Sequence, residues 1–197
     1  MNDVFGAARE VQELFDRHDW KSCLIGGLAV IRWGRKRTTD DADFTLLTGF
    51  GDEELFLNVI AAEFREREPD EINFALSARV YRGYASNGIQ VDIALAAFPF
   101  EEEIINRAQP YEFMPGCVLR VCSVQDLIVM KAFAGRSQDL ADLQYLIAWH
   151  WKSLDWSFIE RQLTEICDMS ENVTSVPKLA ELRSEIERKL RSRRKQP

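Results

Sequence analysis

The chain has 197 residues, of which 46% are hydrophobic and 29% are charged, a composition typical of a globular protein with one substantial core. Its formal net charge of −7 argues against an overall basic surface for nucleic acid. No apolar stretch is long enough to span a bilayer, so we expect no membrane segment.

The reactive side chains exclude several further kinds of site. The four cysteines show no CxxC spacing and there are only two histidines, so we expect neither a structural zinc site nor a disulfide framework. The scarcity of histidine also disfavours serine or cysteine hydrolase chemistry. Because the N-terminus lacks the basic and apolar layout of a signal peptide, we expect a reducing, cytoplasmic location.

Hydrophobic periodicity predicts strands with interspersed helices in the first part of the chain. In chain order, the expected elements are a helix over 3–17, a strand over 22–25, a helix over 28–33, a strand over 41–48 and a helix over 52–67. Two apolar runs then flank Asn87-Gly88. Because both turn residues tolerate a positive φ, this segment predicts a hairpin with a type I′ turn.

The remainder of the chain is predicted to become helical. In order, it contains a short helix over 100–107, a strand pair at 111–113 and 118–122, and helices over 123–134, 137–149, 156–168 and 177–192. This order indicates an α/β (α+β) protein, in which a mixed sheet with flanking helices over 1–122 carries a helical region over 123–197, packed as one compact unit. The basic stretch 191–195 is expected to fray.

Three aspartates in four positions open the predicted strand at 41–48, within the sequence RTTDDAD. Side chains at i and i+2 share a face of a strand, so Asp41 and Asp43 point the same way, about 6 to 7 Å apart. Asp40 points the other way. Two carboxylates on one face are hard oxygen ligands suited to Mg²⁺ and phosphate oxygens.

A third carboxylate lies in the strand IQVDIAL. Asp92 is opposite an apolar face, where an isolated acid is costly unless a charged group faces it. If this strand neighbours that of Asp41 and Asp43, the three carboxylates converge in the layout for two-metal phosphoryl or nucleotidyl displacement. Gly26 and Gly27, at the upstream strand-to-helix turn, allow backbone N–H groups to approach phosphates.

These residues resemble a known superfamily. GGLAV, then R-x-T-x-D-x-D at Arg37, Thr39, Asp41 and Asp43, then Asp92 on a later strand, is similar to the polymerase-beta-like nucleotidyltransferases. The segment SVQDLIVMKAFAGRSQDLADLQYL, residues 123–146, resembles the AbiEii/AbiGii-type minimal nucleotidyltransferases. The chain departs from the superfamily at Gly27, where serine is often found.

The resemblance implies a metal-dependent enzyme that moves a nucleoside monophosphate from an NTP to an acceptor. Asp41, Asp43 and Asp92 would bind Mg²⁺ or Mn²⁺, with Asp92 also acting as general base. The triphosphate would be held by Gly26, Gly27, Arg37, Thr39 and Lys131. Arg136, Asp139 and Asp142 would line or buttress the site.

The acceptor stays open. A tRNA end or a hydroxyl of a partner protein would suit a toxin-antitoxin-like enzyme with a cognate antitoxin, whereas an aminoglycoside or another small molecule would suit a resistance enzyme. The basic clusters available to RNA are residues 32–37 and the C-terminal tail. A non-catalytic module that binds a nucleotide or a partner is a further alternative.

The residues also allow purely structural readings. RTTDDAD can be a polar turn, residues 35–37 a solvated loop, and Lys131 a surface lysine with a partly buried stem. Asp139 and Asp142 lie one helical turn apart and can cap their helix or pair with Arg136. For these two acids the sequence slightly favours the structural role.

Overall fold

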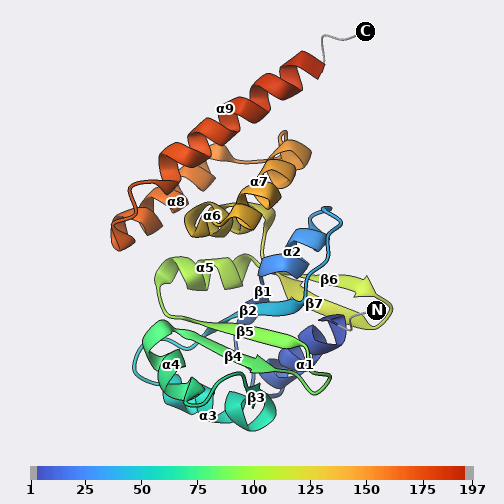
Figure 1. Cartoon of the computed structure of the whole chain (residues 1–197), viewed down its shortest axis with the longest axis vertical. Helices are drawn as coiled ribbons and strands as arrows, with labels where there is room; N and C mark the ends of the chain where they lie inside the picture. The colour runs from blue at the N-terminus through green and yellow to red at the C-terminus, as the bar shows by residue number, and fades with distance from the viewer. Residues whose placement is uncertain (1–3, 194–197) are drawn as a thin grey trace. The chain divides into compact units, whose positions relative to one another are not determined.

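A computed structural model of the chain describes residues 4–193, and within them the strands form one mixed sheet in the order β3-β4-β5-β2-β1-β7-β6 (Figure 1). The strand bounds are β1 Ser22–Leu24, β2 Asp41–Leu47, β3 Arg65–Glu66, β4 Val80–Tyr84, β5 Gln90–Ala96, β6 Gln109–Met114 and β7 Cys117–Val121. The centre is parallel where β2 pairs with β5 and antiparallel where β2 pairs with β1.

The helices alternate with the strands at first and then follow one another without strands between them. Their bounds are α1 Val4–Arg17, α2 Gly26–Arg32, α3 Glu53–Glu63, α4 Glu71–Ala78, α5 Pro99–Arg107, α6 Val124–Ala134, α7 Ser137–His150, α8 Trp156–Ser170 and α9 Ser175–Arg193. The predicted mixed α/β class with a helical C-terminal half is thereby confirmed. The beginning of the helix predicted over 3–17 and the end of the basic stretch 191–195 lie outside the described residues.

Alternation along the central strands places one face of the sheet in the core. In β2, Ala42 and Phe44 are fully buried, as are Val91 and Ile93 in β5. Phe44 meets Phe15 of α1 edge to face, with ring centroids 5.9 Å apart. The opposite face of these strands is only partly buried, which leaves the acidic side chains accessible.

The helix predicted over 52–67 is wrong at its C-terminal end. It stops at Glu63, because the chain extends at Phe64 and residues 65–66 pair with β4 as an edge strand. Phe64 is buried in this extended segment, whereas Leu55 of α3 is 67% exposed. Helix α4 was not predicted.

The hairpin around Asn87-Gly88 is present, but its turn is not type I′. Within residues 4–193, Gly88 has a positive φ of +80° and Asn87 is not among the non-glycine residues with positive φ. The amide of Ala85 donates to the carbonyl of Ile89, and that of Gly88 to Ala85, so the strands are joined by a longer loop. The side chain of Asn87 instead accepts from the amide of Ile89.

The chain forms two compact units. The sheet unit contains residues 1–32 and 36–123, and the helical unit contains residues 33–35 and 124–197. The division into 1–122 and 123–197 stays a prediction from the sequence, and it did not include the excursion of 33–35 into the helical unit. Packing of the two regions as one compact body stays a prediction. No helix in the stretch from 4 to 193 is both long and apolar enough to cross a bilayer.

Candidate active site

Strand β2 presents Asp41 and Asp43 on its partly buried face. Both residues alternate with Ala42 and Phe44, whose burial fixes which way the strand faces. A shift of one residue would bury the two carboxylates and expose the apolar side chains, so the register is strongly specified. The burial of the apolar face of the strand therefore fixes the direction of its acidic face.

Strand β5 adds the third carboxylate beside the first two. Asp43 and Asp92 are register partners in the parallel pairing of β2 with β5, so their side chains leave the same face of adjacent strands, whose backbones lie about 4.8 Å apart. Val91 and Ile93 are fully buried on the other face. The structure thus brings Asp41, Asp43 and Asp92 together on one face.

The glycine turn packs directly against this acidic face. Gly26 has a φ of +61°, and a Cβ atom there would lie 1.7 Å from Oδ2 of Asp43. The amide of Gly27 donates to the same oxygen across 3.3 Å. Only glycine permits both the left-handed backbone and this close approach.

Residues 37–39 form a second wall of the turn. Thr39 Oγ1 donates to Asp41 Oδ1 across 2.8 Å, and the guanidinium of Arg37 lies 3.4 Å from the same hydroxyl. A Cβ on Gly27 would lie only 2.1 Å from Thr39 Oγ1. Because the threonine side chain occupies that space, the chain has glycine where the superfamily often has serine.

Asp92 is held by an arginine that the sequence did not single out. Arg67, just beyond β3, forms an ion pair with Asp92. Burial raises the pKa of Asp92, and the Arg67 charge and hydrogen bond counter this rise while the negative charge of Asp41 adds to it. The ionised form of Asp92 is therefore stabilised by a neighbouring positive charge.

The donor set fits a divalent cation, although its side chains are engaged with protein groups. Three carboxylates share one face of two adjacent strands, and carboxylate oxygens are the ligands that Mg²⁺ and Mn²⁺ prefer. Among residues 4–193, however, no group of three His, Cys, Asp or Glu side chains is already arranged to hold a metal. Asp92 shares one carboxylate oxygen with Arg67, so this guanidinium would border a metal held by all three acids.

Lys131 lies in the helical unit, where it is buried in an ion-pair network. Its Nζ is 2.8 Å from Asp139 Oδ1 and 2.8 Å from Asp142 Oδ2. Arg136 Nε donates to Asp139 Oδ2 across 2.7 Å, and Arg35 pairs with Asp142. The network links helices α6 and α7 with segment 33–35, consistent with a structural role for the two acids.

The charges in this network hold Asp139 ionised. Burial alone would raise the pKa of Asp139, but hydrogen bonds and charges from Arg136 and Lys131 outweigh burial and keep the pKa below its ordinary value. Both acids are almost completely buried. Removing one charged member would leave a buried charge less fully compensated, which is costly for a buried ion pair.

The basic cluster predicted over 32–37 is divided among several partners. Arg32 lies over the ring of Tyr111 at 3.9 Å, and Arg35 pairs with Asp142. The carbonyl of Gly34 accepts from the hydroxyl of Tyr145 across 2.7 Å, and that of Trp33 lies 3.0 Å from Nε2 of His150. Arg32 and Arg35 are thus engaged within the protein, whereas Lys36 of the same cluster is exposed.

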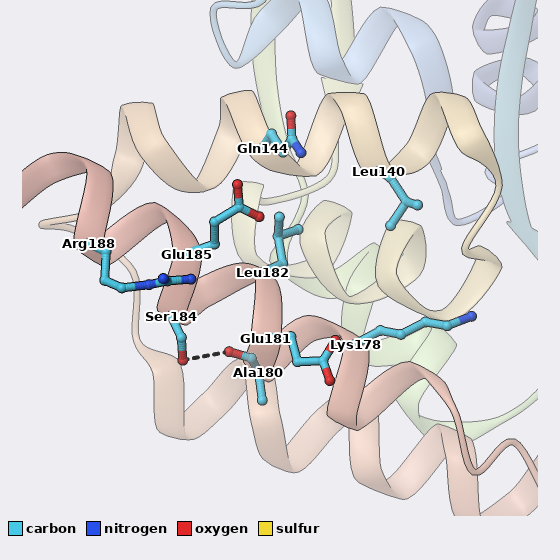
Figure 2. A pocket seen from close by; sticks show the side chains of 9 residues that line it. All are labelled: Leu140, Gln144, Lys178, Ala180, Glu181, Leu182, Ser184, Glu185 and Arg188. Carbon is cyan, nitrogen blue, oxygen red and sulfur yellow. Dashed lines mark hydrogen bonds between the residues drawn. The ribbon is translucent and has the colours of Figure 1, made fainter.

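A separate groove of about 780 Å³ lies along α7 and α9 of the helical unit (Figure 2). Charges of both signs line it, with Lys178 and Arg188 beside Glu181 and Glu185. None of the predicted site residues is among its lining residues. The acidic face of the sheet is consequently the better candidate for chemistry.

Sequence reasoning missed Arg67 because residues 65–67 were assigned to a helix. Pro69, two residues further on, is a common stop after a helix and gave no signal against that assignment. Arg35 was noted only as part of a basic loop. Its partner Asp142 is more than a hundred positions away along the chain, and nothing in the local sequence couples the two.

Comparison with known proteins supports the fold. The model of DUF6036, a nucleotidyltransferase family of unknown function, matches residues 2–191. The solution structure of the antibiotic-resistance factor ANT(2″)-Ia is similar with a TM-score of 0.58 and 15% identity, over 87% of this chain and 95% of that one. Its crystal structure with adenylyl-2″-tobramycin gives 0.54 and 16%, over 84% and 98%.

An antigenic nucleotidyltransferase-like protein from Paracoccidioides brasiliensis is similar with a TM-score of 0.50 and 12% identity, over 90% of this chain and 93% of that one. At these identities the likeness concerns the fold. No curated protein matches the sequence.

Proposed function

Since the chain belongs to the DUF6036 family of nucleotidyltransferases, we propose that it transfers a nucleoside monophosphate from an NTP to a hydroxyl acceptor with the help of Mg²⁺ or Mn²⁺. One observation carries this proposal: the register of β2 and β5 sets Asp43 beside Asp92, with Asp41 on the same face. No core requirement explains three like charges there, whereas metal-assisted displacement at phosphorus does.

The reaction forms a bond between the acceptor oxygen and the α-phosphorus of the NTP, and it breaks the bond from that phosphorus to the oxygen bridging to the β-phosphorus. Pyrophosphate leaves. Asp92 takes the proton of the acceptor hydroxyl, a role suited to a carboxylate whose pKa is raised by burial. A divalent metal, when bound, would neutralise the leaving group and favour ionisation of the hydroxyl.

The triphosphate lies on the glycine side of the acids in this proposal. Gly26 and Gly27 open α2, whose N-terminus favours anions, while Arg37 and Thr39 supply side-chain donors beside Asp41. The resemblance to AbiEii-type enzymes implies that Lys131 contributes a positive charge to the binding of the triphosphate. We keep this role as part of the proposal. Within the helical unit, its ammonium group pairs with Asp139 and Asp142.

For the acceptor we favour a tRNA end or a hydroxyl of a partner protein, as in a toxin-antitoxin pair with a cognate antitoxin. A second candidate is an aminoglycoside or another small molecule, supported by the shared fold with ANT(2″)-Ia, whose crystal structure contains adenylyl-2″-tobramycin. The acceptors differ in charge: a polynucleotide is anionic and an aminoglycoside cationic.

The proposal is tested by incubating the protein with one α-³²P-labelled NTP at a time, in separate reactions with total tRNA, candidate partner proteins and aminoglycosides. We expect label in one acceptor class, and its loss in Asp41→Asn and Asp43→Asn. Asp40→Asn is the matched control, because this neighbouring acid is exposed and precedes β2. Undiminished labelling in either β2 variant would refute the assigned roles.

Calorimetry distinguishes the proposed enzyme from a module that binds a nucleotide or a partner without catalysis. Titration of Mg²⁺ and NTP should give binding that depends on the metal and weakens in Asp43→Asn. Identical, metal-independent binding in both proteins, together with no labelled acceptor, would favour a pseudoenzyme over the enzyme proposed.

A further inference from the structure

The acidic face continues into an arginine-rich strip on neighbouring strands. Arg82 of β4 is the register partner of Asp92, and Arg65 of β3 is the partner of Tyr84. The amide of Arg67 donates to the carbonyl of Arg82, which continues the pairing by one residue. Register partners share a face, so the strip Arg65, Arg67, Arg82 and Tyr84 borders the three acids.

The arginines of the strip are not equivalent. Arg82 is fixed by Glu71, a fully buried acid that accepts from its Nε across 2.9 Å and from its backbone amide across 3.1 Å. Arg65 is exposed and lies over the ring of Tyr84 at 4.2 Å. Arg67 faces the same ring from 5.9 Å. Arg82 therefore stabilises the sheet, whereas Arg65 and Arg67 flank an aromatic ring.

The guanidinium of Arg67 is only partly hydrogen-bonded by the described residues. One of its terminal nitrogens binds Asp92, but its Nε is buried and has no hydrogen-bond partner among residues 4–193. A buried donor without an acceptor is unusual in a folded protein and calls for an explanation. A guanidinium can bind a phosphate through Nε and a terminal nitrogen together, which would satisfy both donors.

We propose that Arg67 is the resting counter-ion of Asp92 and that, once a divalent cation binds Asp92, its guanidinium together with Arg65 and Tyr84 holds a phosphate group of the acceptor. The inference rests on the proposed function and narrows its acceptor to a phosphate-bearing polynucleotide. It assigns to one arginine both the competition with the metal and the recognition of the acceptor.

Electrostatics couples the binding of a metal at Asp92 to the binding of a phosphate at Arg67. A cation on Asp92 neutralises the carboxylate that faces Arg67 and places a second positive charge beside a guanidinium that is only 20% exposed. Such a partly buried, unpaired charge is destabilising. An arriving phosphate compensates it, so metal and anion binding favour each other, whereas a cationic acceptor would be repelled.

The position of the strip separates the acceptor from the triphosphate. Gly26 and Gly27 follow β1, which pairs with one edge of β2, and the strip lies beyond β5, which pairs with the other edge. The triphosphate and the phosphate of the acceptor would then approach the acids from opposite sides. An in-line displacement requires such opposed attacking and leaving groups.

The test uses binding alone, without NTP. Mn²⁺ affinity is measured by calorimetry, and a fluorescein-labelled 12-nucleotide single-stranded RNA is followed by anisotropy at several salt concentrations in the presence of Mn²⁺. The variants are Arg67→Ala, Arg67→Lys and Arg65→Ala. The control is Arg9→Ala, since this exposed arginine lies on α1 and its ion pair within the described part of the chain is with its helix neighbour Glu13. Circular dichroism verifies that each variant is folded.

We expect Arg67→Ala to bind Mn²⁺ about tenfold more tightly, because a charge-assisted competitor for Asp92 is lost. The same variant should bind the RNA about fivefold more weakly near 0.1 M salt, with a slope of log K against log salt shallower by about 0.7. Arg67→Lys, which keeps the charge but not the fork, should bind the RNA with intermediate affinity. In Asp92→Asn, Arg67→Ala should leave the Mn²⁺ affinity unchanged.

Equal Mn²⁺ affinity in Arg67→Ala and wild type would overturn the counter-ion role. An RNA affinity and salt slope unchanged in both Arg67→Ala and Arg65→Ala would overturn the phosphate role. Failure of the proposed function is distinguishable, because it appears as absent labelling of every acceptor. A protein that labels an acceptor while these variants bind like wild type refutes this inference alone.

Discussion

Gly26→Ala tests the close contact between the glycine turn and Asp43. The residue has a φ of +61°, and its new Cβ would lie 1.7 Å from Oδ2, 2.4 Å from Cγ and 2.6 Å from Cβ of Asp43. The left-handed backbone costs an alanine about 1 to 2 kcal/mol. Because the Cβ of Asp43 is itself too close, a rotamer change cannot relieve the clash, and the backbone must also shift.

Gly88→Ala separates these two costs. Gly88 also has a positive φ, +80°, but its Cβ would meet nothing within 4 Å, so this variant reports the backbone cost alone. An added atom that forces side chains and backbone to shift costs about 1 to 3 kcal/mol more. We therefore expect Gly26→Ala to lower the free energy of unfolding by about 2 to 5 kcal/mol, and Gly88→Ala by about 1 to 2 kcal/mol.

Urea unfolding followed by circular dichroism measures both values, and Mn²⁺ calorimetry reports whether Asp43 has moved. Gly26→Ala should bind Mn²⁺ more weakly than wild type, whereas Gly88→Ala should bind it equally. If the two variants lose the same stability and the same metal affinity, the turn does not position Asp43 and the reasoning fails.

Two further predictions concern buried carboxylates. Glu71→Gln should lower the free energy of unfolding by about 1 to 3 kcal/mol, because it removes the charge that faces Arg82 while keeping the volume; a urea midpoint equal to that of wild type would contradict the pairing. Asp139 has a lowered pKa, so its stabilisation is present above the ordinary aspartate pKa of about 3.9 and is lost as pH falls through the lowered value. Asp139→Asn should remove this acid-sensitive part of stability, and unfolding curves between pH 7 and pH 3 that keep the wild-type pH dependence would speak against the network.

The sequence was sufficient for the elements that position the acids. Alternation in β2 and β5 showed which side chains share a face, since the apolar side chains of each strand must face the core. The neighbouring position of these strands was an expectation conditional on topology, and the register of Asp43 with Asp92 resolves it. In both strands, the alternating sequence pattern and the burial seen in the structure assign the same residues to the core.

The edge of the sheet could not be predicted in the same way. A two-residue strand such as β3 has too few positions to show a period. Both Phe64, just before it, and Leu55 in α3 fit a helical pattern until their burial is known. The partner of Arg67 is fixed by strand order rather than by spacing along the chain. Long-range ion pairs such as Arg35 with Asp142 are invisible for the same reason.

The excursion of residues 33–35 into the helical unit has a consequence for dissecting the protein. The polypeptide passes between the two units three times, before 33, after 35 and after 123, so a single cut cannot separate them. A fragment ending at 123 would leave the carbonyls of Trp33 and Gly34 without His150 and Tyr145, and a fragment starting at 124 would leave Asp142 without Arg35. Gene fragments or chimaeras that exchange the helical part should therefore exchange residues 33–35 with it.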